Sequence, residues 1–137
     1  MQAMSFSKPR FSKDCDMELL REASLSGYGI IGGKEKLLAN AQKELCFHKL
    51  LSYSDNRFFD GSSYIRCGFK LVSESKPNYR YIKDTKVLSR VSCQKHKLAK
   101  LLGDKFDPSK TEVQNMLDNH WCQIFDYGNK KFVKEYK

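Results

Sequence analysis

A glycine-bearing loop that leads into a helical repeat and then an apolar run is the feature that most limits how this chain can fold. The loop, Tyr28–Gly33, contains three glycines. Apolar residues then recur at the spacing of one helix face, at Leu37, Leu38, Ala41 and Leu45. The segment His48–Tyr53 is typical of a buried strand. We therefore expect a loop, a helix over residues 34–45 and a strand, in that order.

The glycine loop itself suggests chemistry. Glycines at the start of a helix expose several backbone N–H groups near the positive end of the helix dipole, and this arrangement suits a pyrophosphate. The same glycines are equally typical of a tight turn that binds nothing. Both interpretations stay open from the residues alone.

Alternating apolar patterns and turn residues divide the rest of the chain into short elements. We expect strands at 4–6, 17–20, 69–72 and 79–82, and helices over 58–67 and 92–102. The pattern Ser109-x-x-Glu112 predicts a capping box at the start of another helix, and 121–127 with 131–136 predict a hairpin around Gly128-Asn129. The expected fold class is α/β (α+β): a mixed sheet flanked by helices, with a C-terminal helix pair and a β-hairpin.

Size and composition favour one folded domain. A chain of 137 residues with 40% hydrophobic and 30% charged residues has enough apolar surface to bury a core. We expect a single domain over 1–137, with a core at 1–83 and a basic helical and hairpin extension at 84–137. No apolar run of about 18 residues and no export signal pattern occurs, so a cytoplasmic protein without a membrane partner is expected. Five cysteines without a C-x-x-C pair indicate reduced thiols.

The formal charge of +9 is unevenly distributed along the chain. Residues 70–110 carry 11 Lys and Arg against 4 Asp and Glu, which amounts to +7 of the total. Such a block attracts polyanions and releases counterions from phosphates. A solvated basic face with no ligand is the alternative.

Metal and nucleophile motifs are weak. Cys93-x-x-His96 and His120-x-Cys122 lack the spacing of a zinc finger, so we expect no metal. No serine or cysteine shows the histidine and carboxylate pattern of a catalytic triad. The residues alone therefore predict no catalytic side chain.

Two segments resemble those of a known superfamily. Gly29-x-x-Gly32-x-Lys34-x-x-Leu37-Leu38 and Tyr64-x-x-x-Gly68-Phe69 resemble the acyl-CoA loop and closing segment of GNAT-type acyltransferases. The resemblance implies a truncated GNAT-like fold in which the loop amides at Gly29, Gly32, Gly33 and Lys34 hold the CoA pyrophosphate. It also implies that Tyr64 protonates the departing thiolate. The chain departs from the family where Gly29 replaces Arg or Gln and where Lys34 replaces Gly or Ala.

A second resemblance spans nearly the whole chain. Its blocks include Ser7-Lys8-Pro9-Arg10-Phe11, Ser52-Tyr53-Ser54-Asp55-x-Arg57, Ser75-Lys76-Pro77-Asn78-Tyr79-x-Tyr81, Lys95-x-Lys97-Leu98 and Asp126-Tyr127-Gly128-Asn129. In this order they resemble the C-terminal GNAT-like region of Hef-type phage homing endonucleases. In that family a PD-(D/E)xK nuclease domain lies upstream, and it has no counterpart here. The resemblance implies an accessory DNA-contacting module from a phage, acting in the cytoplasm of a bacterial host.

Cations interleaved with aromatic rings are the expected nucleic-acid-binding residues, since cations meet phosphates and rings stack on bases. They are Lys8, Arg10, Arg57, Lys76, Tyr79, Arg80, Arg90, Lys95, Lys97 and Lys100. Tyr79 and Tyr81 could instead face a core, because they alternate along a strand. Arg57 could instead form a local ion pair with Asp55.

Three functions follow as hypotheses. The first is a non-catalytic DNA-binding module, with no cofactor. The second is an N-acetyltransferase that uses acetyl-CoA. The third is a phage protein that blocks a host defence protein through a protein interface. A homodimer is also expected, because a GNAT sheet without its front strands exposes an edge.

Overall fold

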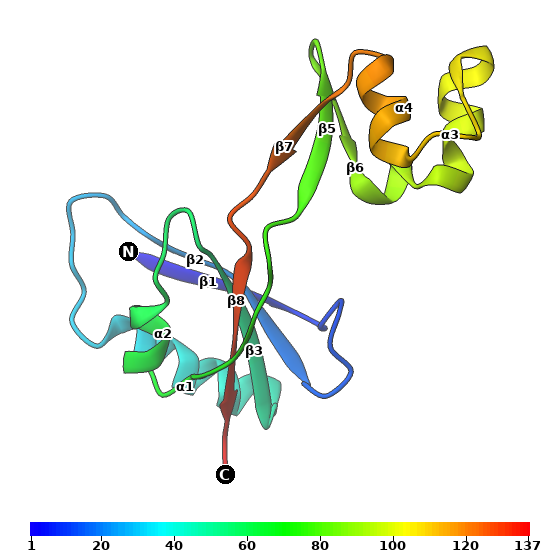
Figure 1. Ribbon diagram of the computed structural model, residues 1–137. Coiled ribbons are helices and arrows are strands. Elements are labelled where there is room, and N and C mark those ends of the chain that lie inside the picture. The colour runs from blue at the N-terminus through cyan, green and yellow to red at the C-terminus, as the bar shows by residue number, and fades with distance from the viewer. The chain divides into compact units, whose positions relative to one another are not determined.

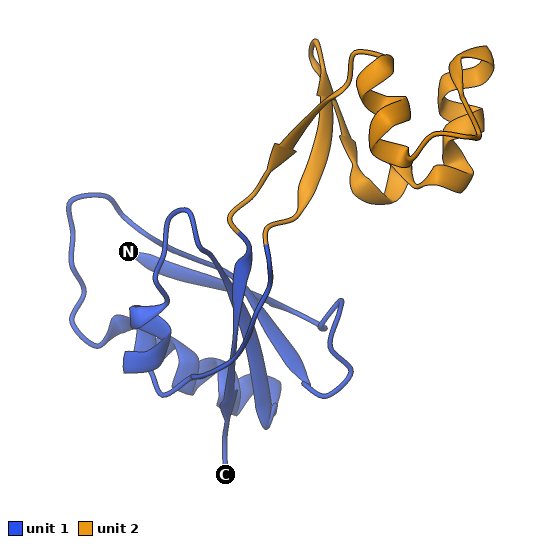
Figure 2. Ribbon diagram, viewed as in Figure 1, with its two compact units in different colours: residues 1–76, 128–137 blue, residues 77–127 orange.

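The computed structural model describes residues 1–137 and divides into two compact units (Figure 2). Unit 1 comprises Met1–Lys76 and Gly128–Lys137, and unit 2 comprises Pro77–Tyr127. Unit 2 is therefore inserted between two strands of unit 1. The α+β class expected from the sequence is confirmed, with four α-helices and eight strands in a mixed sheet and a second, smaller sheet.

Unit 1 is built on a five-stranded sheet in the order β1-β2-β3-β8-β4. Figure 1 labels four of these strands, β1, β2, β3 and β8. Strands β2 and β3 are parallel, and all other neighbours are antiparallel. A helix connects the two parallel strands, as parallel pairing requires. The elements of unit 1 are β1 (Gln2–Ser7), β2 (Met17–Ser24), α1 (Gly33–Leu45), β3 (Lys49–Asp55), α2 (Ser62–Arg66), β4 (Lys70–Glu74) and β8 (Asn129–Glu135).

The core of unit 1 lies between one face of this sheet and its helices. Leu38 of α1 is 1% exposed and packs with Leu50 of β3 and Phe132 of β8. Tyr64 of α2 stacks on Phe132 with ring centroids 5.1 Å apart. The opposite face holds a small cluster of Cys15, Leu51 and Val133, to which no helix contributes. No helix therefore contributes to the packing on this second face, which we call the open face of the sheet.

Unit 2 has a three-stranded antiparallel sheet in the order β6-β5-β7. Its core joins Tyr81, Cys93, Leu98, Met116 and Trp121 from the sheet, the helices and their connections. The elements are β5 (Tyr79–Lys83), β6 (Lys86–Ser89), the 3-10 turns η1 (Arg90–Cys93) and η2 (Gly103–Lys105), α3 (Lys95–Leu102), α4 (Glu112–Asp118) and β7 (Cys122–Phe125).

The expected hairpin at the end of the chain is wrong. β7 pairs with β5 in unit 2, whereas β8 pairs with β3 and β4 in unit 1. Gly128 between them is buried at φ +75, and its Cα faces the Ser75 carbonyl so closely that a side chain could not fit. Asn129 N–H donates to Ser75 Oγ at 2.9 Å. Gly128 and Asn129 therefore connect β7 of unit 2 to β8 of unit 1 and do not form a hairpin turn.

The expected division of the domain at residue 83 also differs from the structure. Residue 83 is the last residue of β5, which belongs with the residues that follow it in unit 2. The supposed extension at 84–137 supplies β8, which lies between β3 and β4 in the sheet of unit 1. The strands expected at 69–72 and 79–82 form, but they belong to different sheets.

Two helix boundaries differ from expectation. Thr111, and not Ser109, caps α4: its Oγ1 accepts from Gln114 N at 3.2 Å, and Gln114 Oε1 accepts from Thr111 N at 2.9 Å. Ser109 instead donates to Asp107 in the preceding turn. The helix expected over 58–67 is shorter, at Ser62–Arg66, because Gly61 adopts φ +85 at its start. The longest helix, α1, has 13 residues, and none has the length and apolar character that a bilayer crossing requires.

Candidate nucleic-acid interface

Positive charge is shared between the two units and is not confined to unit 2. Unit 1 carries 16 Lys and Arg against 10 Asp and Glu, and unit 2 carries 9 against 6. The basic stretch at 70–110 is partly offset within unit 2, because Glu112, Asp118 and Asp126 belong to the same unit. The expected basic middle third is therefore not a separate structural block.

Most basic side chains lack an acidic partner. Ion pairs within 4.0 Å involve only Lys34, Lys49, Arg57 and Lys110, which leaves 21 of the 25 Lys and Arg without one. Unpaired surface cations retain their attraction for phosphates, whereas paired ones are largely neutralised.

Six of the sixteen carboxylates, in contrast, accept backbone N–H groups. Asp16 accepts the backbone N–H groups of His48 and Lys49, both at 2.8 Å, and these bonds lower its pKa. Asp60 likewise accepts Ser62 N–H at 2.9 Å, which lowers its pKa. Glu18, Asp55, Asp107 and Asp126 also accept backbone N–H groups. Acidic side chains thus have structural roles that the basic side chains mostly lack.

Helix α3 carries the densest run of predicted binding residues. Lys97 and Lys100 are three residues apart, so they lie on one exposed face of the helix. Lys97 Nζ donates to the Val91 carbonyl at 2.8 Å. Lys95 lies on another side, near Asp107, whose pKa is lowered first by hydrogen bonds from Ser109 and further by the charges of Lys110 and Lys95. The three lysines of this helix therefore do not form one surface.

Tyr79 and Tyr81 face the core of unit 2. Both hydroxyls donate to Glu112 Oε1, at 3.0 and 3.2 Å. Tyr81 is fully buried. Burial raises the pKa of the Tyr79 and Tyr81 hydroxyls, and the negative charge of Glu112 raises both pKa values further. The Arg90 guanidinium lies over the Tyr79 ring at 5.0 Å. The strand alternation thus gives these rings a packing role and leaves Arg80 on the opposite, exposed side of β5.

Arg57 is bound to its near neighbour Asp55. Arg57 Nη2 donates to Asp55 Oδ2 at 2.6 Å, and Arg57 Nε lies 3.1 Å from the same oxygen. These hydrogen bonds lower the pKa of Asp55. Phe58 and Phe59 follow and are 70% and 66% exposed. The local ion pair left open by the sequence is the arrangement found.

The remaining predicted cations, Lys8, Arg10 and Lys76, are exposed and lie in loops of unit 1. The Arg10 backbone N–H donates to the Glu18 carboxylate at 3.3 Å, and the guanidinium takes no part in this bond. The structure therefore divides the predicted residues: Lys8, Arg10, Arg57 and Lys76 belong to unit 1, and the other six belong to unit 2.

Lys34, near the start of α1, contacts Tyr64 of α2 within unit 1. Lys34 Nζ lies 4.2 Å from the centre of the Tyr64 ring and pairs with Glu22 at 2.6 Å. Ser52 Oγ donates to the Leu19 carbonyl at 3.0 Å and is hydrogen-bonded to Tyr64 Oη at 2.9 Å. Both site residues are thus engaged in structural contacts.

These residues do not fit a CoA pyrophosphate. The Lys34 ammonium, the cation nearest the loop glycines in the sequence, is paired with Glu22. At Gly33 an added Cβ would overlap Gln2 Oε1 and lie 2.7 Å from Ile30 Cγ2, so the backbone is closely covered there. Gly29 and Gly32 are open. Because Glu22 offsets the Lys34 charge, the loop offers a pyrophosphate no unpaired Lys34 cation.

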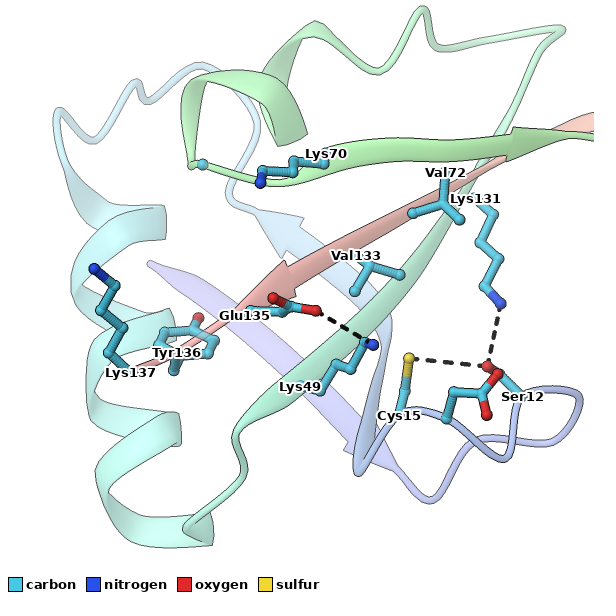
Figure 3. A pocket seen from close by; sticks show the side chains of 12 residues that line it. Ser12, Cys15, Lys49, Lys70, Val72, Lys131, Val133, Glu135, Tyr136 and Lys137 are labelled. Carbon is cyan, nitrogen blue, oxygen red and sulfur yellow. Dashed lines mark hydrogen bonds and ion pairs between the residues drawn. The ribbon is translucent and has the colours of Figure 1, made fainter.

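One group of cations was not predicted from the sequence. Lys49, Lys70, Lys131 and Lys137 line a cavity on the open face of the sheet in unit 1 (Figure 3). They come from three separate segments of the chain, at Lys49, at Lys70 and at Lys131 with Lys137, so no single local motif marks the group. The only signal is the alternation of residues 131, 133, 135 and 137 on one face of a strand.

No three His, Cys, Asp or Glu side chains in residues 1–137 are grouped as metal ligands. All five cysteines are free thiols. Comparison with protein-family models and with curated proteins finds no match for this sequence.

Proposed function

We propose that this chain is a non-catalytic nucleic-acid-binding module with DNA as its partner. One observation carries the proposal: 21 of its 25 cations lack an ion pair within 4.0 Å. Each phosphate that such a cation neutralises releases a counterion, so binding is favoured without base recognition. The resemblance to homing endonucleases supports DNA over RNA.

The exposed pair Lys97 and Lys100 on α3 is the part of this surface most suited to a test. Neither side chain lies in the core of unit 2, and neither forms an ion pair. Their charges can therefore be reversed without opening the core, although Lys97→Glu also removes the hydrogen bond to the Val91 carbonyl. A surface of this kind positions a protein on the phosphate backbone and carries no sequence information by itself.

Binding of a fluorescent duplex, followed by anisotropy between about 50 and 200 mM NaCl, tests the proposal. We expect affinity to fall steeply with salt, and the double variant K97E/K100E to reduce the slope of log K against log salt by about 2. The matched control is K36E/K43E on α1, which changes the net charge equally at exposed positions. Undetectable or salt-independent binding by the unaltered chain contradicts the proposal, as does an equal effect of both variants.

A protein interface is the second candidate, favoured by Phe58 and Phe59. Their rings are exposed and lie 6.4 Å apart, and exposed aromatic pairs are typical of contact surfaces. The double variant F58S/F59S is expected to abolish capture of a host protein from nuclease-treated lysate and to leave duplex binding intact. If the variant still captures the protein, this candidate is wrong.

The acetyltransferase alternative has less support, since Lys34 is paired with Glu22 and the Tyr64 hydroxyl with Ser52. It still predicts a measurable response. Acetyl-CoA would raise the melting temperature if it bound the native chain. We expect no rise at millimolar acetyl-CoA.

A further inference from the structure

A cavity of about 470 Å³ lies on the open face of the sheet in unit 1 (Figure 3). Its size is within the range of small-molecule sites, roughly 300–1,000 Å³. It is separate from the glycine loop, because none of the residues at 28–34 lines it. All of its lining residues belong to unit 1, whereas α3 belongs to unit 2.

Sheet register gathers the lysines of this cavity. Lys131, Val133, Glu135 and Lys137 alternate along and just beyond β8, so they share one face. Lys49 of β3 is the register partner of Glu135, and Lys70 of β4 is the partner of Val133. Three strands therefore bring four cations to one side of the sheet.

The charge of the cavity is only partly balanced. Four lysines face two carboxylates, those of Asp14 and Glu135. Lys49 Nζ lies 3.3 Å from Glu135 Oε1, and Lys131 Nζ donates to Ser12 Oγ at 3.1 Å. Lys70 and Lys137 form no ion pair or side-chain hydrogen bond. The side chains that line the cavity thus have a net charge of +2, with two cations ready to bind an anion.

Apolar side chains lie beside these cations. Val133 is buried against Leu51, whereas Val72 is 58% exposed although it lines the cavity. An exposed valine two residues from the unpaired Lys70 on β4 is suited to a ligand with an anionic group and an apolar body. A bare inorganic ion would leave Val72 uncovered.

We propose that this cavity binds a phosphomonoester, with its phosphate between Lys70 and Lys137 and its apolar part on Val72. A phosphomonoester carries about −1.5 to −2 charges at pH 7, which matches the excess of two cations. Lysine binds phosphate as a point charge, so no fixed bidentate geometry is needed. Two sources share this chemistry: a free mononucleotide and the 5′-phosphate of a nucleic-acid strand.

Titration of the full chain with thymidine 5′-monophosphate, followed by amide NMR, tests the site. We expect saturable shifts at residues 68–72 and 131–137, and no saturable shifts with thymidine. K70E and, separately, K137E should each raise Kd about tenfold, since each removes a charged contact. The control K36E, on α1 and outside the cavity, should leave Kd unchanged.

Equal binding of thymidine, shifts confined to other residues, or an unchanged Kd in both K70E and K137E would each overturn the site. Two oligonucleotides that differ only in a 5′-phosphate distinguish the sources: stronger binding of the phosphorylated strand assigns the site to strand ends, and equal binding assigns it to free nucleotides. The site does not depend on duplex binding. K97E/K100E should weaken the duplex and spare the mononucleotide, so either proposal can fail while the other stands.

Discussion

The side chain of Asn115 and the backbone of Asp107 exchange two hydrogen bonds. Asp107 N–H donates to Asn115 Oδ1 at 2.8 Å, and Asn115 Nδ2 donates to the Asp107 carbonyl at 2.9 Å. Asn115 Nδ2 also lies 3.0 Å from the Thr111 carbonyl. Asn115 is 1% exposed, so one buried amide fixes the turn that precedes α4.

Asn115→Ala should therefore destabilise unit 2. The substitution leaves the Asp107 N–H and carbonyl without these partners, and we expect the free energy of unfolding to fall by about 2–3 kcal/mol. Urea unfolding followed by Trp121 fluorescence measures it, since Trp121 belongs to the same core. Gln94→Ala, at an exposed position of unit 2 with no side-chain cap bond, should change stability by less than about 0.5 kcal/mol.

Gly61→Ala should destabilise unit 1 through two separate effects. Gly61 has φ +85, and an added Cβ would overlap the ring of Phe132. The left-handed backbone costs about 1–2 kcal/mol and the overlap about 1–3 kcal/mol more. Gly27→Ala, at φ +81 with nothing within 4 Å, isolates the backbone effect. Equal losses in the two variants, measured by thermal unfolding, would mean that the Phe132 ring moves aside freely.

Two tyrosines of unit 1 should respond oppositely to removal of the hydroxyl. Tyr136 Oη is buried without a hydrogen-bond partner, and burial raises its pKa. Tyr136→Phe should therefore leave stability unchanged or raise it by about 1 kcal/mol. Tyr64→Phe loses the bond to Ser52 and should lower stability by about 0.5–1.5 kcal/mol. Chemical denaturation compares them, and a loss in Tyr136→Phe would reveal a partner for that hydroxyl.

Acid should destabilise unit 1 through Asp16. Backbone hydrogen bonds from His48 and Lys49 lower its pKa below the value of the unfolded chain, about 3.9. A lowered pKa means that the stabilisation is present above pH 4 and is lost as pH falls through the folded pKa. Asp16→Asn should therefore be less stable than the unaltered chain at pH 6 and should lose less between pH 6 and 3. Parallel declines of the urea midpoint would contradict this role.

Local pattern predicted the elements whose own residues show one clear hydrophobic period. The repeat from Leu37 to Leu45 and the apolar run before Tyr53 gave α1 and β3, because one period fixes the buried face. β6 was missed, since Lys86–Ser89 is short and half polar and gains its place by pairing with β5. The hairpin was wrong because Gly128-Asn129 resembles a turn, although its contacts are with Ser75.

The candidate site could be predicted only in part, because some of its residues are brought together by contacts between distant parts of the chain. Exposed cations on α3 follow from sequence, since Leu98 fixes which side of the helix is buried. The core position of Tyr79 and Tyr81 depends on Glu112, more than 30 residues away. The lysine cavity requires the register of β3, β4 and β8, which no local pattern encodes.

The insertion of unit 2 before β8 has a consequence for synthesis on the ribosome. Residues 77–127 can leave the exit tunnel and fold as a unit while β3 and β4 still have no strand between them. Until residues 129–135 emerge, the nascent chain exposes two strand edges that invite aggregation. Any ribosomal pause, stop codon or protease cut ahead of residue 129 therefore releases an intact insert attached to an incomplete host, which is a substrate for chaperones.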